Sequence, residues 1–414
     1  MTIRDAAMIG PTITAMPSRW ALLFVLMHIA GFSGAATAQT LDQQRCSAPD
    51  PDVAIPGCTA MIQSGHETQE NLAKAYNNRG NAYGEKGDLD RAIADYDQAI
   101  RLDPRYAHAY YNRGRAYGEK GDLDRAIADF DQVIRLDPKV ALAYYNRGNA
   151  YGDKGDNDRA IADYTEAIRL DPKYANAYNN RGNAYDDKGD YESAIADFDQ
   201  AIRLDPKYAY AYNNRGNAYH YKGDNDRAIA DYDEAIRLDP KYATAYNNRG
   251  TAYDDKGDYN RAIADYDEAI RLDPKYALAY NNRGTAYYEK ADYDRAIADY
   301  DEVMRLDPKY ANAPYNRGRA YDAKGDYDRA IADFDQAIRL NPKDAVYYNE
   351  RGIAYRHKGD YDRAIADYTE AIRLDSKYAK AYYNRRLAKR AKGDSAGGDA
   401  DIAKAKQLNS SVGN

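Results

Sequence analysis

Apolar and small residues recur along most of this chain with a fixed period of 34 residues. In the stretch that begins at Ala73, the residues Tyr76, Gly80 and Tyr83 are spaced i, i+4 and i+7, which is one face of a helix. After a glycine and an aspartate, alanine, isoleucine and tyrosine return at helical spacing. Each period therefore predicts two helices joined by a tight turn, and nothing in it is typical of a strand.

Particular residues mark the ends of both predicted helices. Gly87 is expected to adopt the left-handed conformation that ends the first helix, and Asp88 or Asp90 to cap the second. Asp103-Pro104 ends the second helix, because the residue before a proline is pushed out of the helical region. A repeat of this length indicates a solenoid, in which each helix pair buries its apolar face against its neighbours. The sequence therefore predicts an all-α fold.

The small and aromatic residues resemble the tetratricopeptide repeat. Counted from Ala73, they fall at positions 4, 8, 11, 20, 24 and 27 of each unit, with proline at position 32. The resemblance covers about residues 73–412. It implies antiparallel helix pairs stacked into a right-handed superhelix, with the first helices lining a concave groove. We expect nine repeat units over residues 73–378, and a degenerate tenth unit with a C-terminal cap over residues 379–414.

A few units depart from the pattern. Pro314 replaces the position-four tyrosine of the eighth unit, and Ala291 replaces the turn glycine of the seventh. The tenth unit has Arg386, Lys389 and Gly398 where the others have glycine, tyrosine and alanine. Polar residues at core positions are what a solubilising terminal cap requires, so the array is expected to end there.

Residues 1–38 do not belong to the repeat. Arg19 precedes an apolar run over residues 20–30, and small residues follow up to Ala38. This pattern predicts a signal peptide cleaved after Ala38. A retained membrane anchor is the alternative, but the run is short for crossing ~30 Å of hydrocarbon. The expected location is periplasmic or secreted, with no stable membrane span after cleavage.

The two cysteines, Cys46 and Cys58, follow this segment. An exported chain enters an oxidising compartment, where a pair at this spacing is expected to form a disulfide. Residues 54–62 look like a degraded second helix, with Cys58 where the repeats place tyrosine or phenylalanine. The bond would then staple an N-terminal helical cap over residues 39–72. The alternative, a redox-active or metal-binding pair, lacks CxxC spacing and a nearby histidine.

Arginine occupies position seven and aspartate position twenty-three in all ten units. We expect a partly buried pair that ties the helices of one unit, or adjacent units, together, because the planar fork of arginine grips a carboxylate with two hydrogen bonds. The alternative is an arginine stripe for anionic ligands. The aspartates are Asp95, Asp129, Asp163, Asp197, Asp231, Asp265, Asp299, Asp333, Asp367 and Asp401.

Position six is the candidate binding site, since it is asparagine in nearly every unit. In the resembled family such residues face the groove, and the row is similar to the asparagine ladder of O-linked N-acetylglucosamine transferases. An amide donates to a peptide carbonyl and accepts from a peptide N–H, so a ladder holds an extended backbone with little regard to sequence. Alternatively, these amides satisfy neighbouring helix groups or reflect recent duplication. The candidates are Asn78, Asn112, Asn146, Asn180, Asn214, Asn248, Asn282 and Asn316.

Composition and motifs narrow the function further. The formal net charge is -7 and 30% of residues are charged, with both signs interspersed, so there is no basic field for nucleic acid. The histidines beyond residue 38 lack metal-ligand spacing, and phosphate-binding and nucleophile motifs are missing. We expect no enzymatic activity, no cofactor and no metal site.

Two classes of function remain. The first is an interaction scaffold that binds an extended peptide or a partner segment in the concave groove. The second is a structural spacer or assembly component of the cell envelope, without a groove ligand. Polar caps at both ends of the array favour the first, whereas an exposed apolar terminal face would favour the second. The sequence does not name the partner.

Overall fold

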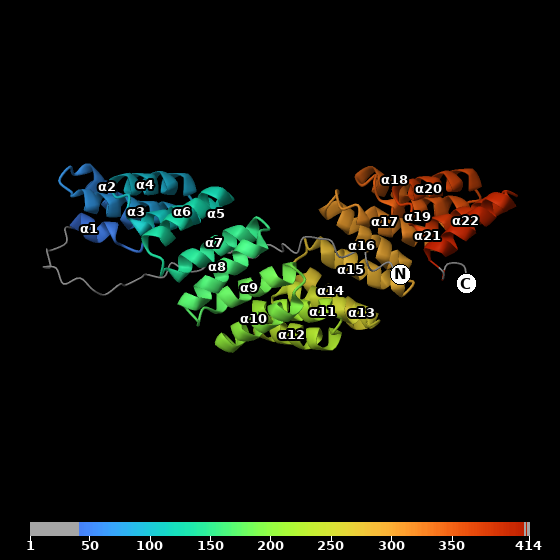
Figure 1. Ribbon diagram of the computed structural model, residues 1–414, viewed down its shortest axis with the longest axis horizontal. Coiled ribbons are helices and arrows are strands. Elements are labelled where there is room, and N and C mark those ends of the chain that lie inside the picture. The colour runs from blue at the N-terminus through green and yellow to red at the C-terminus, as the bar shows by residue number, and fades with distance from the viewer. Residues whose placement is uncertain (1–40, 410, 412–414) are drawn as a thin grey trace. The chain divides into compact units, whose positions relative to one another are not determined.

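The computed structural model describes residues 41–409 and 411, and these residues form 22 helices and no strand (Figure 1). The all-α prediction is confirmed. The predicted signal peptide, residues 1–38, lies outside the described residues. The chain divides after Gly223 into two compact segments, here called the N-terminal and the C-terminal segment. Between residues 41 and 409, no helix is both long and apolar enough to cross a membrane.

The described part of the N-terminal segment contains α1 (Leu41–Cys46), α2 (Pro51–Gln63), α3 (Gln69–Glu85), α4 (Leu89–Leu102), α5 (Ala107–Glu119), α6 (Leu123–Leu136), α7 (Ala141–Asp153), α8 (Asn157–Leu170), α9 (Ala175–Asp187), α10 (Tyr191–Leu204) and α11 (Ala209–Tyr221). The C-terminal segment contains α12 (Asn225–Leu238), α13 (Ala243–Asp255), α14 (Tyr259–Leu272), α15 (Ala277–Glu289), α16 (Tyr293–Leu306), α17 (Asn312–Ala323), α18 (Tyr327–Leu340), α19 (Ala345–His357), α20 (Tyr361–Leu374), α21 (Ala379–Ala391) and α22 (Ser395–Leu408).

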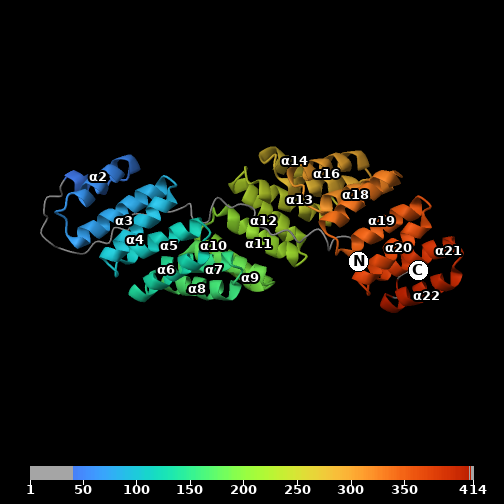
Figure 2. The same ribbon diagram turned by 90° about the horizontal axis from the view of Figure 1, so that it is seen from above.

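The core between paired helices is built from small residues and one aromatic ring. In the first repeat unit Gly80 of α3 faces Tyr96 of α4, and a Cβ atom at Gly80 would lie 2.6 Å from the ring. Ala92 and Ala99 are completely buried beside it. First helices of consecutive units also touch, as α7 and α9 do (Figure 2). Small side chains therefore let the backbones approach, and the tyrosine fills the space that remains.

The turns match the sequence prediction. Gly87 has φ +76°, in the left-handed region that ends α3. The side chain of Asp88 accepts a hydrogen bond from the backbone N–H of Arg91 and caps α4, which ends before Asp103. At the seventh unit Ala291 adopts φ +59°, the one positive φ of a non-glycine residue in the described part of the chain. That conformation is strained for alanine because its Cβ crowds the backbone.

The arginine at position seven joins three helices. Arg113 binds both carboxylate oxygens of Asp129 in its own unit, at 2.8 and 2.7 Å. Its remaining nitrogen reaches Asp97 of the preceding unit at 2.5 Å. Burial raises the pKa of Asp129, although the Arg113 guanidinium opposes this. The predicted structural pair is confirmed, and it links adjacent units as well as the helices of one unit.

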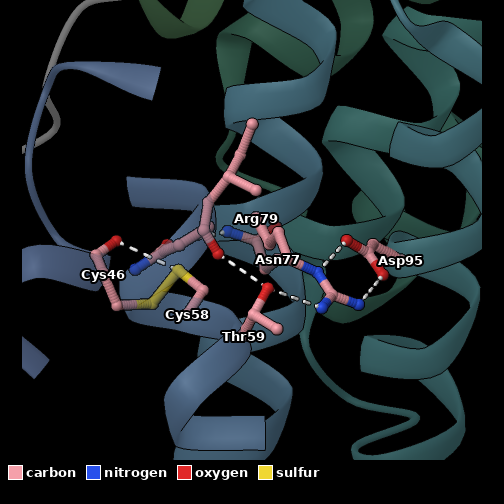
Figure 3. Close-up of a disulfide and its surroundings, with 8 residues drawn as sticks. Cys46, Cys58, Thr59, Asn77, Arg79 and Asp95 are labelled. Atoms are coloured by element: carbon pink, nitrogen blue, oxygen red, sulfur yellow. Dashed lines mark hydrogen bonds and ion pairs between the residues drawn. A yellow bond between two sulfur atoms is a disulfide. The ribbon is translucent and has the colours of Figure 1, made fainter. Parts of the chain in front are cut away.

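The N-terminal helix pair copies this arrangement with different residues. A disulfide joins Cys46, the last residue of α1, to Cys58 in α2 (Figure 3). Arg79 binds Asp95 on one side and donates to the Thr59 hydroxyl at 3.0 Å on the other (Figure 3). Thr59 therefore stands where Asp97 stands for the next unit, and α2 acts as the second helix of a shortened unit.

Charged contacts replace aromatic packing in the last helix pair. Arg385 keeps its paired contact with Asp401, at 2.9 and 2.7 Å. Lys389, which replaces a tyrosine, lies 2.9 Å from the same carboxylate. Arg386 replaces the crossing glycine, and Ile402 stands in the sequence where the other units have the aromatic residue. This pair is therefore more polar than the pairs before it.

Candidate functional site

The position-six asparagines lie on the first helices of the repeat units, but they differ in exposure. Asn146 and Asn180 are buried, each with 7% of its surface exposed. The other six candidates are half-buried. Each described segment therefore carries a row of amides at the boundary between its core and solvent. The half-buried members are Asn78, Asn112, Asn214, Asn248, Asn282 and Asn316.

Side-chain amides link consecutive first helices. Asn112 donates from Nδ2 to Oδ1 of Asn77 in the preceding unit at 3.0 Å, and Asn77 donates to Oδ1 of Asn78 at 3.4 Å. Hydrogen bonds thus run from position six to position five of the preceding unit, and on to position six of that unit. The same inter-unit bond joins Asn214 to Asn179, Asn282 to Asn247, Asn316 to Asn281 and Asn384 to Asn349, at 2.9–3.1 Å.

The position-five asparagines were not among the predicted site residues, yet they hold this network together. Asn179 and Asn281 are 1% and 2% exposed. A buried amide must find hydrogen-bond partners, so these residues fix the orientation of the position-six amides beside them. The sequence did contain a signal for this role of position five. Asparagine and tyrosine alternate there, and both side chains offer a hydrogen-bond acceptor to the following unit.

Where position five is tyrosine, the position-six amide of the following unit donates both of its N–H groups within the protein. Asn146 donates to the Tyr111 hydroxyl at 3.0 Å and to the Leu142 carbonyl at 2.9 Å. Asn180 donates to the Tyr145 hydroxyl at 3.0 Å and to Oδ1 of Asn149 at 2.8 Å. Both N–H groups of each amide are committed inside the protein. Asn146 and Asn180 are thus engaged with neighbouring helix groups, as the alternative interpretation expects.

Position nine serves the buried tyrosine of its own unit. Asn81 accepts a hydrogen bond from the Tyr96 hydroxyl at 2.9 Å, and Asn149 accepts one from Tyr164 at 2.8 Å. In the ninth unit the residue is Ile353, and the buried hydroxyl of Tyr368 has no hydrogen-bond partner among the described residues. Asn81 and Asn149 at position nine are therefore structural, because each accepts a hydrogen bond from the buried tyrosine of its unit.

Charges interrupt the amide row near the end of the array. Glu350 replaces the position-six asparagine and accepts a hydrogen bond from Asn349 at 3.1 Å. Burial raises the pKa of the Glu350 carboxyl group, although the nearby Arg319 guanidinium opposes this. Arg319 itself lies over the Tyr288 ring at 4.5 Å. Charged side chains therefore interrupt the amide row around Arg319 and Glu350.

Between residues 41 and 409, no group of three or more histidine, cysteine, aspartate or glutamate side chains is placed to hold a metal ion. Both cysteines are joined in the disulfide. The arrangement presents amides, hydroxyls and aromatic rings, which suit recognition of a polypeptide.

Comparisons with solved structures find helical-repeat proteins. A tetratricopeptide repeat protein from Parabacteroides merdae is 20% identical, covers 60% of this chain and 98% of its own, and has a TM-score of 0.48. MamA is 32% identical over 40% of this chain and 96% of its own, with a TM-score of 0.37. YrrB, described as a TPR protein with an unusual peptide-binding site, is 27% identical over 45% and 95%, with a TM-score of 0.39. A comparison with curated proteins finds no match.

Family models match most of the repeat array. A tetratricopeptide repeat model matches residues 145–209 and 315–379, and two more match residues 277–310 and 198–230. A TPR repeat model matches residues 80–121, 114–155, 216–255 and 252–291. Together the matches run from residue 80 to residue 379 with a single short gap, and so they cover well over half of the chain. This chain belongs to the tetratricopeptide repeat family.

Proposed function

We propose that this protein is an exported, non-enzymatic interaction scaffold that holds an extended peptide, or an extended segment of a partner protein, along the face of its first helices. Tetratricopeptide repeat proteins generally mediate protein–protein interactions. The observation that carries the proposal is the row of half-buried position-six amides, of which Asn112, Asn214, Asn282 and Asn316 each donate one hydrogen bond to the preceding unit. An amide has two N–H groups and two acceptor lone pairs, so one such bond leaves capacity for a ligand.

The amide network lowers the cost of binding. A free asparagine side chain loses rotamer freedom when it binds a ligand, at about 0.5–1.5 kcal/mol per side chain. Here position five already holds the position-six amide in one orientation before a ligand arrives. A peptide backbone repeats its donors and acceptors, as the amide row does. Side chains of the ligand would add selectivity where charged residues interrupt the amide row, around Arg319 and Glu350.

Export is the second part of the proposal. Its support is the predicted signal peptide and the cysteine pair, because disulfides form and persist in oxidising compartments such as the bacterial periplasm. The bond holds α1, a helix of 6 residues, against α2. In a reducing compartment the same hairpin would lose this link.

The test is a pull-down from envelope extract with residues 39–414. The binding variant replaces Asn112, Asn214, Asn282 and Asn316 by alanine. The control variant replaces Asn146 and Asn180, whose N–H groups are already used inside the protein. We expect a partner retained by the wild type and the control, and lost by the binding variant.

Circular dichroism must show that all three proteins are equally helical. If the binding variant retains the partner, or the wild type captures none, the groove proposal is wrong. The remaining candidate is then the structural spacer or assembly component of the cell envelope without a groove ligand.

A further inference from the structure

The last turn of the first helices carries residues that vary from unit to unit, at positions twelve and thirteen. Asp186 occupies position twelve on α9, and its Oδ1 atom is buried without a hydrogen-bond partner. A buried carboxylate oxygen normally has a partner, because leaving it unsatisfied costs about 1–3 kcal/mol. Asp186 is thus one of a few side chains among the described residues with such an atom, and Asp254, at the same position on α13, is another.

A second aspartate at position twelve, Asp322, does have a side-chain partner in the following unit. Asp322 on α17 lies 3.0 Å from Nδ1 of His357, which is at position thirteen of the next unit. The corresponding residue for Asp186 is Tyr221 on α11. Burial raises the pKa of the Tyr221 hydroxyl, and the nearby Asp186 carboxylate raises it further. No hydrogen bond joins the two side chains among the described contacts.

Tyr221 turns instead toward another aromatic ring. It stacks on Tyr191 of α10, with ring centroids 5.6 Å apart and an angle of 16° between the planes. His220 lies beside it, with ring centroids 5.9 Å apart. Tyr221 is nevertheless 42% exposed, one of few large apolar side chains with so much surface in solvent. A stacked aromatic pair, of which Tyr221 is exposed and Tyr191 half-buried, thus lies beside the unsatisfied carboxyl group.

The charged side chain that acts on the Asp186 carboxyl group is itself acidic. This side chain is Asp187, the adjacent residue on α9. Tyr221 on α11 lies near Asp186, and the Tyr191 and His220 rings contact Tyr221. The nearest lysines in sequence are already paired, Lys188 with Asp158 and Lys222 with Glu192. Burial, reinforced by Asp187, raises the pKa of Asp186 to about 7. An additional positive charge would remove this electrostatic conflict.

We propose that Asp186, Tyr191 and Tyr221 form a site for a cationic side chain, lysine or arginine, of the peptide held along the first helices. The carboxylate would pair with the ammonium or guanidinium group, and the stacked rings would bind its apolar stem and its charge. Asn179, Asn183 and Asp186 follow i, i+4 and i+7 on α9, so the site continues the face that carries the position-five amides. This inference rests on the proposed peptide-binding function.

The test uses an array of random synthetic peptides probed with labelled residues 39–414. We expect lysine or arginine to be enriched among the bound peptides, and this enrichment to disappear for Asp186→Asn. Asp322→Asn is the matched control, since its partner is within the protein, and it should keep the enrichment. For one selected peptide, Asp186→Asn should raise Kd about tenfold, whereas the peptide with glutamine in place of the cation should bind both proteins equally.

The outcomes separate the two proposals. Peptide binding without enrichment of basic residues would overturn the cation site and leave the groove function intact. Enrichment that survives Asp186→Asn would also overturn it. Failure of the wild type to bind any peptide would remove both, and the four-asparagine variant shows whether binding depends on the amide row.

Discussion

The interior repeat units and the two terminal helix pairs fill the same space with different chemistry. In the interior, a glycine on the first helix meets an aromatic ring on the second, as Gly182 meets Phe198. In the N-terminal pair the space between the helices is spanned by the disulfide between Cys46 and Cys58. In the last pair Arg386 replaces the glycine, and Lys389 binds Asp401.

The difference follows from the neighbours that each pair has. An interior unit is buried on both sides by other units, so close steric fit supplies its stability. A terminal pair lacks one neighbour and must face water on that side. Its short α1 buries little apolar surface, and a covalent bond compensates. We therefore expect interior positions to be intolerant of added volume and terminal ones to depend on specific bonds.

The largest effect should come from filling an interior crossing. A Cβ atom at Gly182 would lie 2.6 Å from the Phe198 ring, so Gly182→Leu must push the helices apart. We expect a loss of about 3 kcal/mol or more in the free energy of unfolding. Arg386→Leu, at the same position of the last unit, should change it by less than about 1 kcal/mol. Thermal and denaturant unfolding of both variants measure this, and equal losses would contradict the comparison.

Removing the disulfide should loosen the N-terminal pair alone. Cys46→Ala combined with Cys58→Ala should cost about 2–3 kcal/mol, because the bond closes a short loop. Hydrogen exchange should quicken in α1 and α2 and stay unchanged in α7 and α8. A reductant should reproduce the effect in the wild type and do nothing to the double variant. Unchanged exchange in α1 would show that packing alone holds it.

An interior unit also contains a charge that opposes folding. The pKa of Asp186 is raised to about 7 in the folded chain, by burial and by Asp187, above the ordinary value of 3.8. Protonation therefore favours the fold, and this contribution is lost as pH rises through 7. Asp186→Asn should raise stability at pH 8 by on the order of 2 kcal/mol and have little effect at pH 4. Asp322→Asn should give no gain in stability at either pH. Melting curves of both variants at pH 4 and pH 8 test this.

The smallest effect concerns the turns. Ala291 has φ +59°, whereas the corresponding Gly257 has φ +77°. Ala291→Gly should stabilise the seventh unit by about 1 kcal/mol, since glycine adopts this region without strain. The reverse change, Gly257→Ala, should cost about the same in the sixth unit. A shift of equal sign in the two melting temperatures would contradict this explanation.

Much of the fold was predictable because the residues that form and end the helices recur in nearly every repeat unit. The 34-residue period, the turn glycines and the capping aspartates predicted the helix pairs and their ends. Arginine and aspartate at two fixed positions predicted an ion pair, since both persist even in the tenth unit. The sequence left open whether this arginine ties the helices of one unit or adjacent units; the structure shows that it does both, as Arg113 does with Asp129 and Asp97, because that depends on how units stack.

By itself the sequence determined the helices, their turns, the cysteine pairing and the candidate row of asparagines, because these depend on local periodicity and on residue type. Tertiary structure alone decided which amides are buried, which have both N–H groups committed, and that position five orients position six. It also decided that Asp322 has a histidine partner while Asp186 lacks one. Exposure and hydrogen-bond partners depend on side chains a whole repeat apart, and near-identical units conceal such differences until they are packed together.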